Sequence, residues 1–155
     1  MLKLMKSYRS WMDSGVEKLS FELGLLIGRI SLGCLMLFGH GLGKLQKYSI
    51  LTDKFPDPLG IGSQLSLTLA IFAEVICSIL LMIGLGTRLA LTQLIATMIV
   101  AAFIVLNELP FFAAPGEKSK EMALMYLTGY IILFFTGPGK FSIDEKISNL
   151  IKKDD

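Results

Sequence analysis

The chain has 155 residues, of which 53% are apolar and 18% are charged, and its formal net charge at pH 7 is +2. Soluble domains average about 45–50% apolar and about 25% charged residues. The apolar excess argues against an ordinary soluble protein and favours an integral membrane protein, which would contact the lipid bilayer. Neither the small net charge nor any motif points to nucleic acid as a partner.

Four blocks hold most of the apolar residues. Two of them contain a single charged residue each, Arg29 and Glu74, and the other two contain none. Each block reaches or approaches the roughly 17–25 residues that cross the hydrocarbon layer as a helix. Lipid cannot satisfy exposed backbone groups, and the blocks show no period-two alternation, so helices are predicted rather than barrel strands. The predicted membrane-spanning helices cover about residues 22–40, 64–84, 89–108 and 120–137.

Short connections between the four predicted spans indicate an all-α membrane protein, an antiparallel bundle of four transmembrane helices in a single domain, residues 1–155. An amphipathic helix is predicted on the membrane surface at each end of the chain, at about residues 2–19 and 142–153. In the second of these helices, Ser142 followed by Glu145 has the spacing of a capping box.

The distribution of basic residues predicts which side of the membrane each end faces. Nine lysines and arginines lie in the terminal segments and the turn between the second and third spans, and five lie in the other two connections. Cytoplasmic segments of membrane proteins are the richer in these residues. We therefore expect a multi-pass membrane protein with both termini in the cytoplasm. No cleavage site follows the first apolar block, so an uncleaved first helix is expected.

Arg29 and Glu74 are the charges expected within the membrane. A charge at mid-membrane costs about 2.5–3.5 kcal/mol or more, so each needs a partner or water. By the rise of about 1.5 Å per helical residue, Arg29 lies roughly 10 Å and Glu74 roughly 15 Å from the cytoplasmic side. We therefore expect them to pair between the first two spans. The pair is either a structural pin that fixes helix register or a polar site for a carbonyl-bearing or anionic small molecule.

A second group of candidate side chains lies near the outer ends of the spans. His40 and Lys44 are four residues apart and share a helix face, and Glu121 begins the fourth span at a similar height. Histidine titrates near neutral pH, so the group is a candidate for proton exchange. The alternative is that these residues only flank or cap helices. Tyr126 and Tyr130 either line a polar path into the bundle or hydrogen-bond a neighbouring helix.

Residue counts exclude several cofactors. The chain has one histidine and two cysteines, whereas a bis-histidine haem needs two histidines and an iron–sulfur cluster needs more thiolates. Cys34 and Cys77 form no C-x-x-C pair, and no nucleotide-binding or zinc-protease motif occurs. No metal and no intrinsic redox cofactor is therefore expected, and no residue is assigned as catalytic. Whether the chain is an enzyme stays open.

Several motifs follow one another in a fixed order along the chain. They are Arg29 in the first span, "GHGLGKL" at 39–45, Glu74 in the second span, "GLGTR" at 84–88, Glu121 opening the fourth span, and "GPGKFSID" at 137–144. In order and spacing they resemble the DoxX family of small bacterial and archaeal four-helix membrane proteins, over roughly residues 22–147. Many members of that family have a histidine near the end of the third span, where this chain has Asn107.

The resemblance implies a setting rather than a reaction. The family takes its name from a subunit of a thiosulfate:quinone oxidoreductase. The resemblance therefore implies that this chain is a subunit of a quinone-linked or sulfur-redox membrane complex, in which a partner subunit supplies the electrons. Two other functions stay open from the residues themselves: a non-catalytic module that anchors or assembles partner proteins, and a small transporter or proton path. Self-association is compatible with each of them.

Overall fold

The computed structural model describes residues 1, 4–5, 15–114 and 116–154, and every regular element in this part of the chain is helical. Three of the helices are long and apolar enough to cross a membrane, and they cover Glu17–Gln46, Ser63–Ile83 and Thr87–Val105. A fourth apolar helix, α8 (Glu121–Thr136), is shorter. Its 16 residues extend about 24 Å at about 1.5 Å per residue. The predicted all-α membrane fold is confirmed.

The first span is a continuous rod built from α2 (Gly15–Met36), the π-helical segment η1 (Leu37–Gly41) and α3 (Leu42–Gln46). The break that we expected between a surface helix and this span, at about residues 19–22, is absent. Neither glycine nor proline occurs between Val16 and Leu23, so nothing local ends the helix there. Residues 6–14 of the expected N-terminal surface helix lie outside the described residues.

The second and third spans form a helical hairpin. The second consists of α5 (Ser63–Ile71), η2 (Phe72–Cys77) and α6 (Ser78–Ile83), and the third of α7 (Thr87–Val100) and η3 (Ala101–Val105). Gly84 and Gly86 make the turn between them with φ values of 71° and 56°. This left-handed conformation is costly for any residue with a Cβ atom, which explains the sequence "GLG" at the turn.

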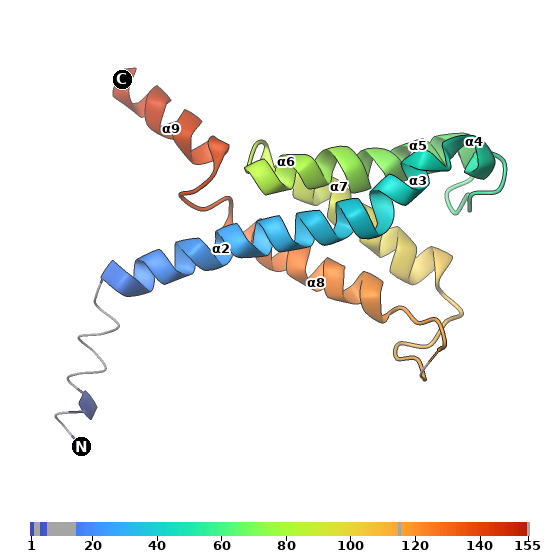
Figure 1. The fold of residues 1–155 in the computed structure, drawn as a ribbon, viewed down its shortest axis with the longest axis horizontal. Helices are drawn as coiled ribbons and strands as arrows, with labels where there is room; N and C mark the ends of the chain where they lie inside the picture. The colour runs from blue at the N-terminus through green and yellow to red at the C-terminus, as the bar shows by residue number, and fades with distance from the viewer. Residues whose placement is uncertain (2–3, 6–14, 115, 155) are drawn as a thin grey trace.

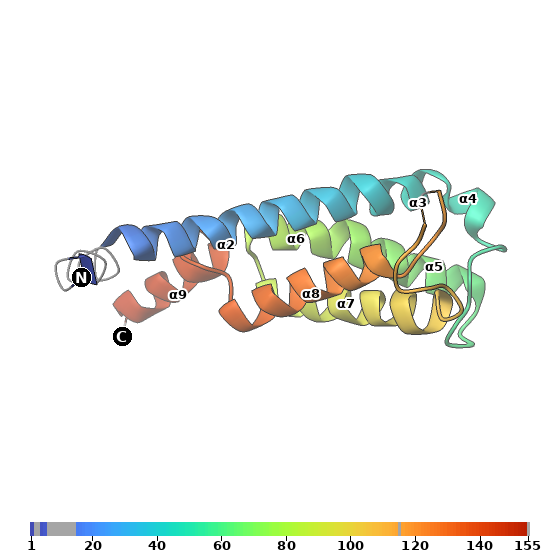
Figure 2. The same cartoon turned by 90° about the horizontal axis from the view of Figure 1, so that it is seen from below.

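The four spans run antiparallel and side by side, as Figures 1 and 2 show from two directions. α8 packs against α7 and α2, and α2 packs against α6. One end of the bundle, here called the terminal end, holds the start of α2, the turn at 84–86 and α9 (Ile143–Asp154). The opposite end, the loop end, holds α4 (Tyr48–Leu51) and the connections at 52–62 and 106–120.

The bundle buries a narrow core and leaves apolar side chains outside. The core contains fully buried residues such as Leu67, Leu91 and Leu94, whereas Phe38, Leu89 and Phe135 are at least two-thirds exposed. In water such a surface would be unfavourable, because every exposed apolar area costs free energy. Lipid contact removes that cost, which agrees with the spans read from the sequence.

A C-terminal segment, residues 137–144, closes the terminal end of the bundle. The Asp144 carboxylate accepts hydrogen bonds from the backbone N–H groups of Gly86 (2.7 Å) and Thr87 (2.9 Å), at the start of α7. The Asp144 N–H donates to the Gly84 carbonyl. Ser142 Oγ accepts the N–H of Glu145, which confirms the predicted N-terminal cap of α9.

Asp144→Ala should lower the free energy of unfolding by about 1–2 kcal/mol, the usual loss when a helix-capping carboxylate is removed. Thermal unfolding in detergent, followed by circular dichroism, measures the change. Asp53→Ala, at an exposed position of the loop end, is the matched control and should have no effect.

The same comparison should depend on pH. Burial raises the pKa of the Asp144 carboxyl, but the N–H donors of Thr87 and Gly86 and the charge of Arg29 outweigh it, so this pKa lies below its usual value. A group whose pKa is lowered by folding stabilises the protein above its unfolded pKa and loses that contribution as the pH falls. The gap between wild type and Asp144→Ala should therefore shrink progressively below about pH 4. A gap that widens with acid would contradict the assignment.

Candidate functional site

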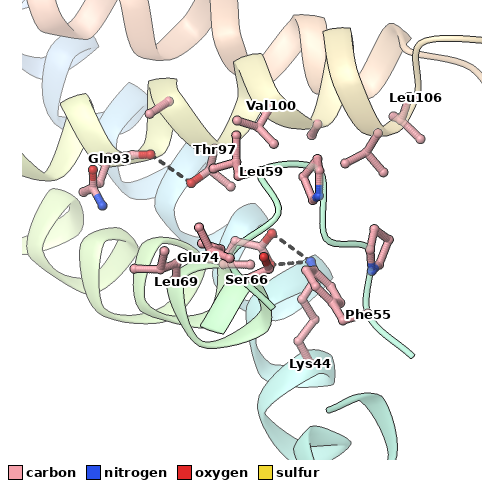
Figure 3. A pocket seen from close by; sticks show the side chains of 17 residues that line it. Lys44, Phe55, Leu59, Ser66, Leu69, Glu74, Gln93, Thr97, Val100 and Leu106 are labelled. Atoms are coloured by element: carbon pink, nitrogen blue, oxygen red, sulfur yellow. Dashed lines mark hydrogen bonds and ion pairs between the residues drawn. The ribbon is translucent and has the colours of Figure 1, made fainter. Parts of the chain in front are cut away.

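A partly buried ion pair joins the first two spans. Glu74, in η2, is only 5% exposed although it lies within an apolar span. Lys44 Nζ, in α3, donates to both carboxylate oxygens of Glu74, at 2.8 Å to Oε1 and 2.5 Å to Oε2. Figure 3 shows the two side chains pointing toward each other. Two candidates from the sequence thus meet, but not in the combination that was expected.

The close approach of η1 and η2 makes this pair possible. A Cβ atom at Gly41 would lie 2.8 Å from the carbonyl oxygen of Glu74 and 2.9 Å from Val75 Cγ2. A side chain at position 41 would therefore push the two spans apart. Both helical segments in this contact, η1 and η2, are π-helical. A π-helical turn is wider than an α-helical one and frequently accompanies functional sites.

The predicted pair between Arg29 and Glu74 is wrong. Arg29 is fully buried, and its Nη2 donates to the carbonyl of Phe141 at 2.8 Å. Its Nη1 would lie 1.9 Å from a Cβ atom at Gly84, so the guanidinium lies directly against the turn of the helical hairpin. Asp144 is the acidic residue that acts electrostatically on it. Arg29 therefore belongs to the terminal end of the bundle and Glu74 to the interior nearer the loop end.

Two properties of helices explain the error. Side chains in an α-helix lean toward its N-terminus, so the long stem of Arg29 extends toward the terminal end rather than toward Glu74. Glu74 precedes Gly84 by ten residues, which corresponds to about 15 Å along the span. The depth estimate assumed that the first span starts near residue 22, whereas the residue of this span that meets the backbone of Glu74 is Gly41, twelve residues after Arg29.

Arg29 holds the C-terminal segment in place. Its Nε and Nη1 atoms are buried without a hydrogen-bond partner in the described part of the chain. Glu22, about two turns earlier in α2, accepts the backbone N–H of Lys140 at 2.7 Å. α2 thus binds residues 140 and 141 through two side chains, which is a structural role.

An aromatic row leads from the ion pair into the bundle. The His40 ring meets the Tyr126 ring edge-on at 5.6 Å between centroids, and Tyr126 stacks on Tyr130 at 5.9 Å. Tyr130 is fully buried, and its hydroxyl has no hydrogen-bond partner in the described part of the chain. The charges of Lys44 and Glu74 both act on His40. These five residues form one connected polar cluster.

Glu121 lies apart from this cluster. It is exposed at the start of α8, and within the described residues it forms no ion pair. The neighbouring Lys120 is buried instead: its Nζ donates to the Asn107 carbonyl at 2.7 Å and lies 5.1 Å from the centroid of the Phe111 ring. Lys120 therefore fixes the connection between the third and fourth spans.

A cavity of about 420 Å³ opens beside the ion pair, between the second and third spans. Lys44 and Glu74 form part of its wall, and Gln93 and Thr97 line it from α7 (Figure 3). The remaining lining side chains are mostly apolar and include Leu69, Val100 and Leu106. Sequence reasoning missed this pocket, although Gln93, a lone amide in an uncharged span, was its available signal.

The connection at residues 55–61 covers the pocket at the loop end. Phe55, Leu59 and Ile61 contribute apolar side chains to its lining. Asp57 holds this connection, since its carboxylate accepts hydrogen bonds from the N–H groups of Ile61 and Gly62 and from the hydroxyl of Ser66. These donors, the Gly62 N–H above all, lower the pKa of the Asp57 carboxyl, so it stays ionised at neutral pH.

Within the described part of the chain, no three or more His, Cys, Asp or Glu side chains come together as metal ligands. Cys34 and Cys77 are free thiols, and Cys34 Sγ contacts Met82 Sδ at 3.4 Å. The cysteines therefore pack in the bundle. The polar groups available for chemistry in the interior are Lys44, Glu74 and the aromatic row of His40, Tyr126 and Tyr130.

Comparison with known proteins shows what this chain is similar to. A family model described as DoxX matches residues 24–107, which contain Lys44 and Glu74. The uncharacterized membrane protein Rv3486 of Mycobacterium tuberculosis is 33% identical over 113 residues, covering 61% of this chain and 68% of the relative. No solved structure matches the chain. The match to the family model includes the ion pair of Lys44 and Glu74 and leaves out α8 with its two tyrosines.

Gly41→Ala should destabilise the protein by about 1–3 kcal/mol, because the added methyl group overpacks the contact between η1 and η2. Gly39→Ala is the matched control, since a Cβ atom at Gly39 meets nothing within 4 Å. Thermal unfolding of both variants in the same detergent measures the difference. Equal stability of the two variants would show that the contact at Gly41 does not hold the spans together.

Proposed function

Because the chain belongs to the DoxX family of membrane proteins, we propose that it is a membrane subunit of a quinone-linked or sulfur-redox complex. In this proposal Lys44 and Glu74, rather than Arg29 and Glu74, form its polar intramembrane site. The observation that carries the proposal is a buried carboxylate, Glu74, paired inside the bundle with the partly exposed ammonium group of Lys44. Ionisable residues at membrane depth are costly, and proteins use them mainly where ions, protons or substrates bind.

His40 and the tyrosines behind it give this site a route for protons. His40 contacts the Tyr126 ring, is acted on by the charges of Lys44 and Glu74, and is partly exposed. An imidazole can take up and release a proton near neutral pH. Quinone reduction consumes two electrons and two protons, so a quinone at Lys44 and Glu74 would receive protons through His40. Electrons would come from a partner subunit, since this chain has one histidine and two cysteines.

Membranes from a host that lacks the chain test the role. Restoring the wild-type chain should restore the rate of electron transfer to added quinone, and Glu74→Gln at equal abundance should lower it at least tenfold. A neutral amide keeps the shape of the side chain but cannot exchange a proton or attract Lys44 as strongly. Glu117→Gln, at an exposed position of the loop end, is the matched control and should retain the full rate.

The rival function is a non-catalytic anchor, in which the ion pair only braces the first two spans. The double variant Lys44→Met/Glu74→Leu separates the two functions, because replacing a buried pair by apolar groups is often neutral for stability. If the double variant is stable and retains the full rate of quinone reduction, the ion pair is a brace and the site is disproved. If it is stable and inactive, the site is supported.

We also place the terminal end of the bundle on the cytoplasmic side of a bacterial inner membrane. The excess of basic residues at this end supports that orientation. The exposed apolar side chains of α9, Ile147, Leu150 and Ile151, then contact the lipid surface, as expected for an amphipathic helix.

Reporter fusions measure the orientation. Green fluorescent protein fused after residue 154 should fluoresce, and alkaline phosphatase at the same place should be inactive, because the phosphatase needs the periplasm for its disulfides. Alkaline phosphatase fused after Phe112, in the loop end, should be active. The reverse pattern would invert the proposed topology.

A further inference from the structure

The pocket beside the ion pair has a lining that restricts what it can bind. Its walls are mostly apolar, and its charged members are Lys44 and Glu74, whose charges neutralise each other. Its volume of about 420 Å³ falls in the range of about 300–1,000 Å³ that small-molecule sites occupy. A compact and largely apolar molecule therefore fits it best.

Lys44 has one hydrogen-bond donor left for a ligand. An ammonium group has three N–H bonds, and two of them account for the contacts with Oε1 and Oε2 of Glu74. The third can donate to a carbonyl oxygen without breaking the ion pair. A carboxylate or phosphate would instead bring a second negative charge beside Glu74, which is unfavourable in a low-dielectric interior.

The opposite wall of the pocket offers a second polar contact. Gln93, in α7, carries a carboxamide that both donates and accepts hydrogen bonds and lines the same cavity as Lys44 (Figure 3). The Thr97 hydroxyl already donates a hydrogen bond to the backbone carbonyl of Gln93 at 2.9 Å. A molecule with one polar group at Lys44 and another toward Gln93 uses both ends of the pocket.

The exposure of the lining residues indicates which side of the pocket faces the lipid. The connection at 55–61, held by Asp57, covers the loop end. Between the second and third spans, however, Leu69 is 41% exposed and Val105 is 43% exposed, and both line the pocket. Exposed apolar residues on membrane spans face acyl chains, so this side communicates with the bilayer.

We propose that this pocket binds a neutral, carbonyl-bearing apolar molecule that enters sideways from the bilayer, with its carbonyl oxygen on Lys44 Nζ. The assignment rests on the proposed function in that it gives the substrate class for the same site. It goes further by naming the charge of the ligand, its orientation and its route of entry.

Photolabelling of the full chain in phosphatidylcholine vesicles tests the assignment. The neutral probe is an azidoquinone with a short isoprenoid chain, and the anionic probe is a diazirine-bearing palmitate. The quinone should label residues 55–61 and 93–106, saturably and at least tenfold more efficiently than the palmitate does. Labelling is located by mass spectrometry of peptides. Preferential labelling by the palmitate would overturn the neutral class.

Two substitutions on α7 form a matched pair for this experiment. Ala96→Trp places a bulky side chain in the pocket, and Leu89→Trp places it on the same helix at a position that is 79% exposed. Labelling should fall at least tenfold in Ala96→Trp and stay unchanged in Leu89→Trp. Equal labelling of both variants would show that the probe binds the lipid-facing surface and not the pocket.

Lys44→Met/Glu74→Leu tests the carbonyl contact without leaving a buried charge. Labelling should fall about tenfold, the factor that corresponds to one hydrogen bond; unchanged labelling would remove Lys44 from the site. Saturable labelling of the pocket together with full quinone reduction by Glu74→Gln would overturn the proposed function and keep the pocket. If the probe does not label the pocket but Glu74→Gln still lowers the rate of quinone reduction, the pocket is overturned and the proposed function is kept.

Discussion

The ion pair between Lys44 and Glu74 is the interaction on which the arrangement of the loop end depends. A charge inside a membrane protein is costly unless it meets a partner or water, and Glu74 meets Lys44, so the first and second spans are held together at this depth. Gly41 permits the meeting because it leaves room for the backbone of Glu74. The pocket is lined by this ion pair, and the aromatic row of His40, Tyr126 and Tyr130 lies within reach of its charges. The two features can therefore act together although they lie on different sides of the second span.

The fold could be predicted largely from hydropathy. Apolar blocks of sufficient length have few alternatives in a bilayer, and the spans at Ser63–Ile83 and Thr87–Val105 agree closely with the predicted residues 64–84 and 89–108. The start of the first span could not be predicted. A surface helix and a membrane span can form one continuous helix when no glycine or proline separates them. This is the case here, because α2 continues from Gly15 without a break.

The sequence predicted which charged residues lie near or within the spans, but not which of them form a pair. Composition identifies Arg29, Lys44 and Glu74 as charges near or within the spans, and spacing places His40 beside Lys44. Which charges meet depends on side-chain direction and on contacts between η1 and η2, and neither is visible in a linear pattern. The cover of the pocket at residues 55–61 was equally hidden, because an irregular connection has no periodicity that indicates the face it covers.

The contact between Arg29 and the Phe141 carbonyl also has a consequence for biosynthesis. Arg29 enters the membrane with the first span, whereas its acceptor is translated more than a hundred residues later. Until that moment the guanidinium must remain hydrated or stay near lipid headgroups, because an uncompensated charge is expelled from hydrocarbon. The contact that holds Arg29 in its buried position can therefore form only after the fourth helix has emerged. Completion of the bundle is thus coupled to completion of the polypeptide, because residues 140 and 141 supply the backbone groups that Glu22 and Arg29 bind.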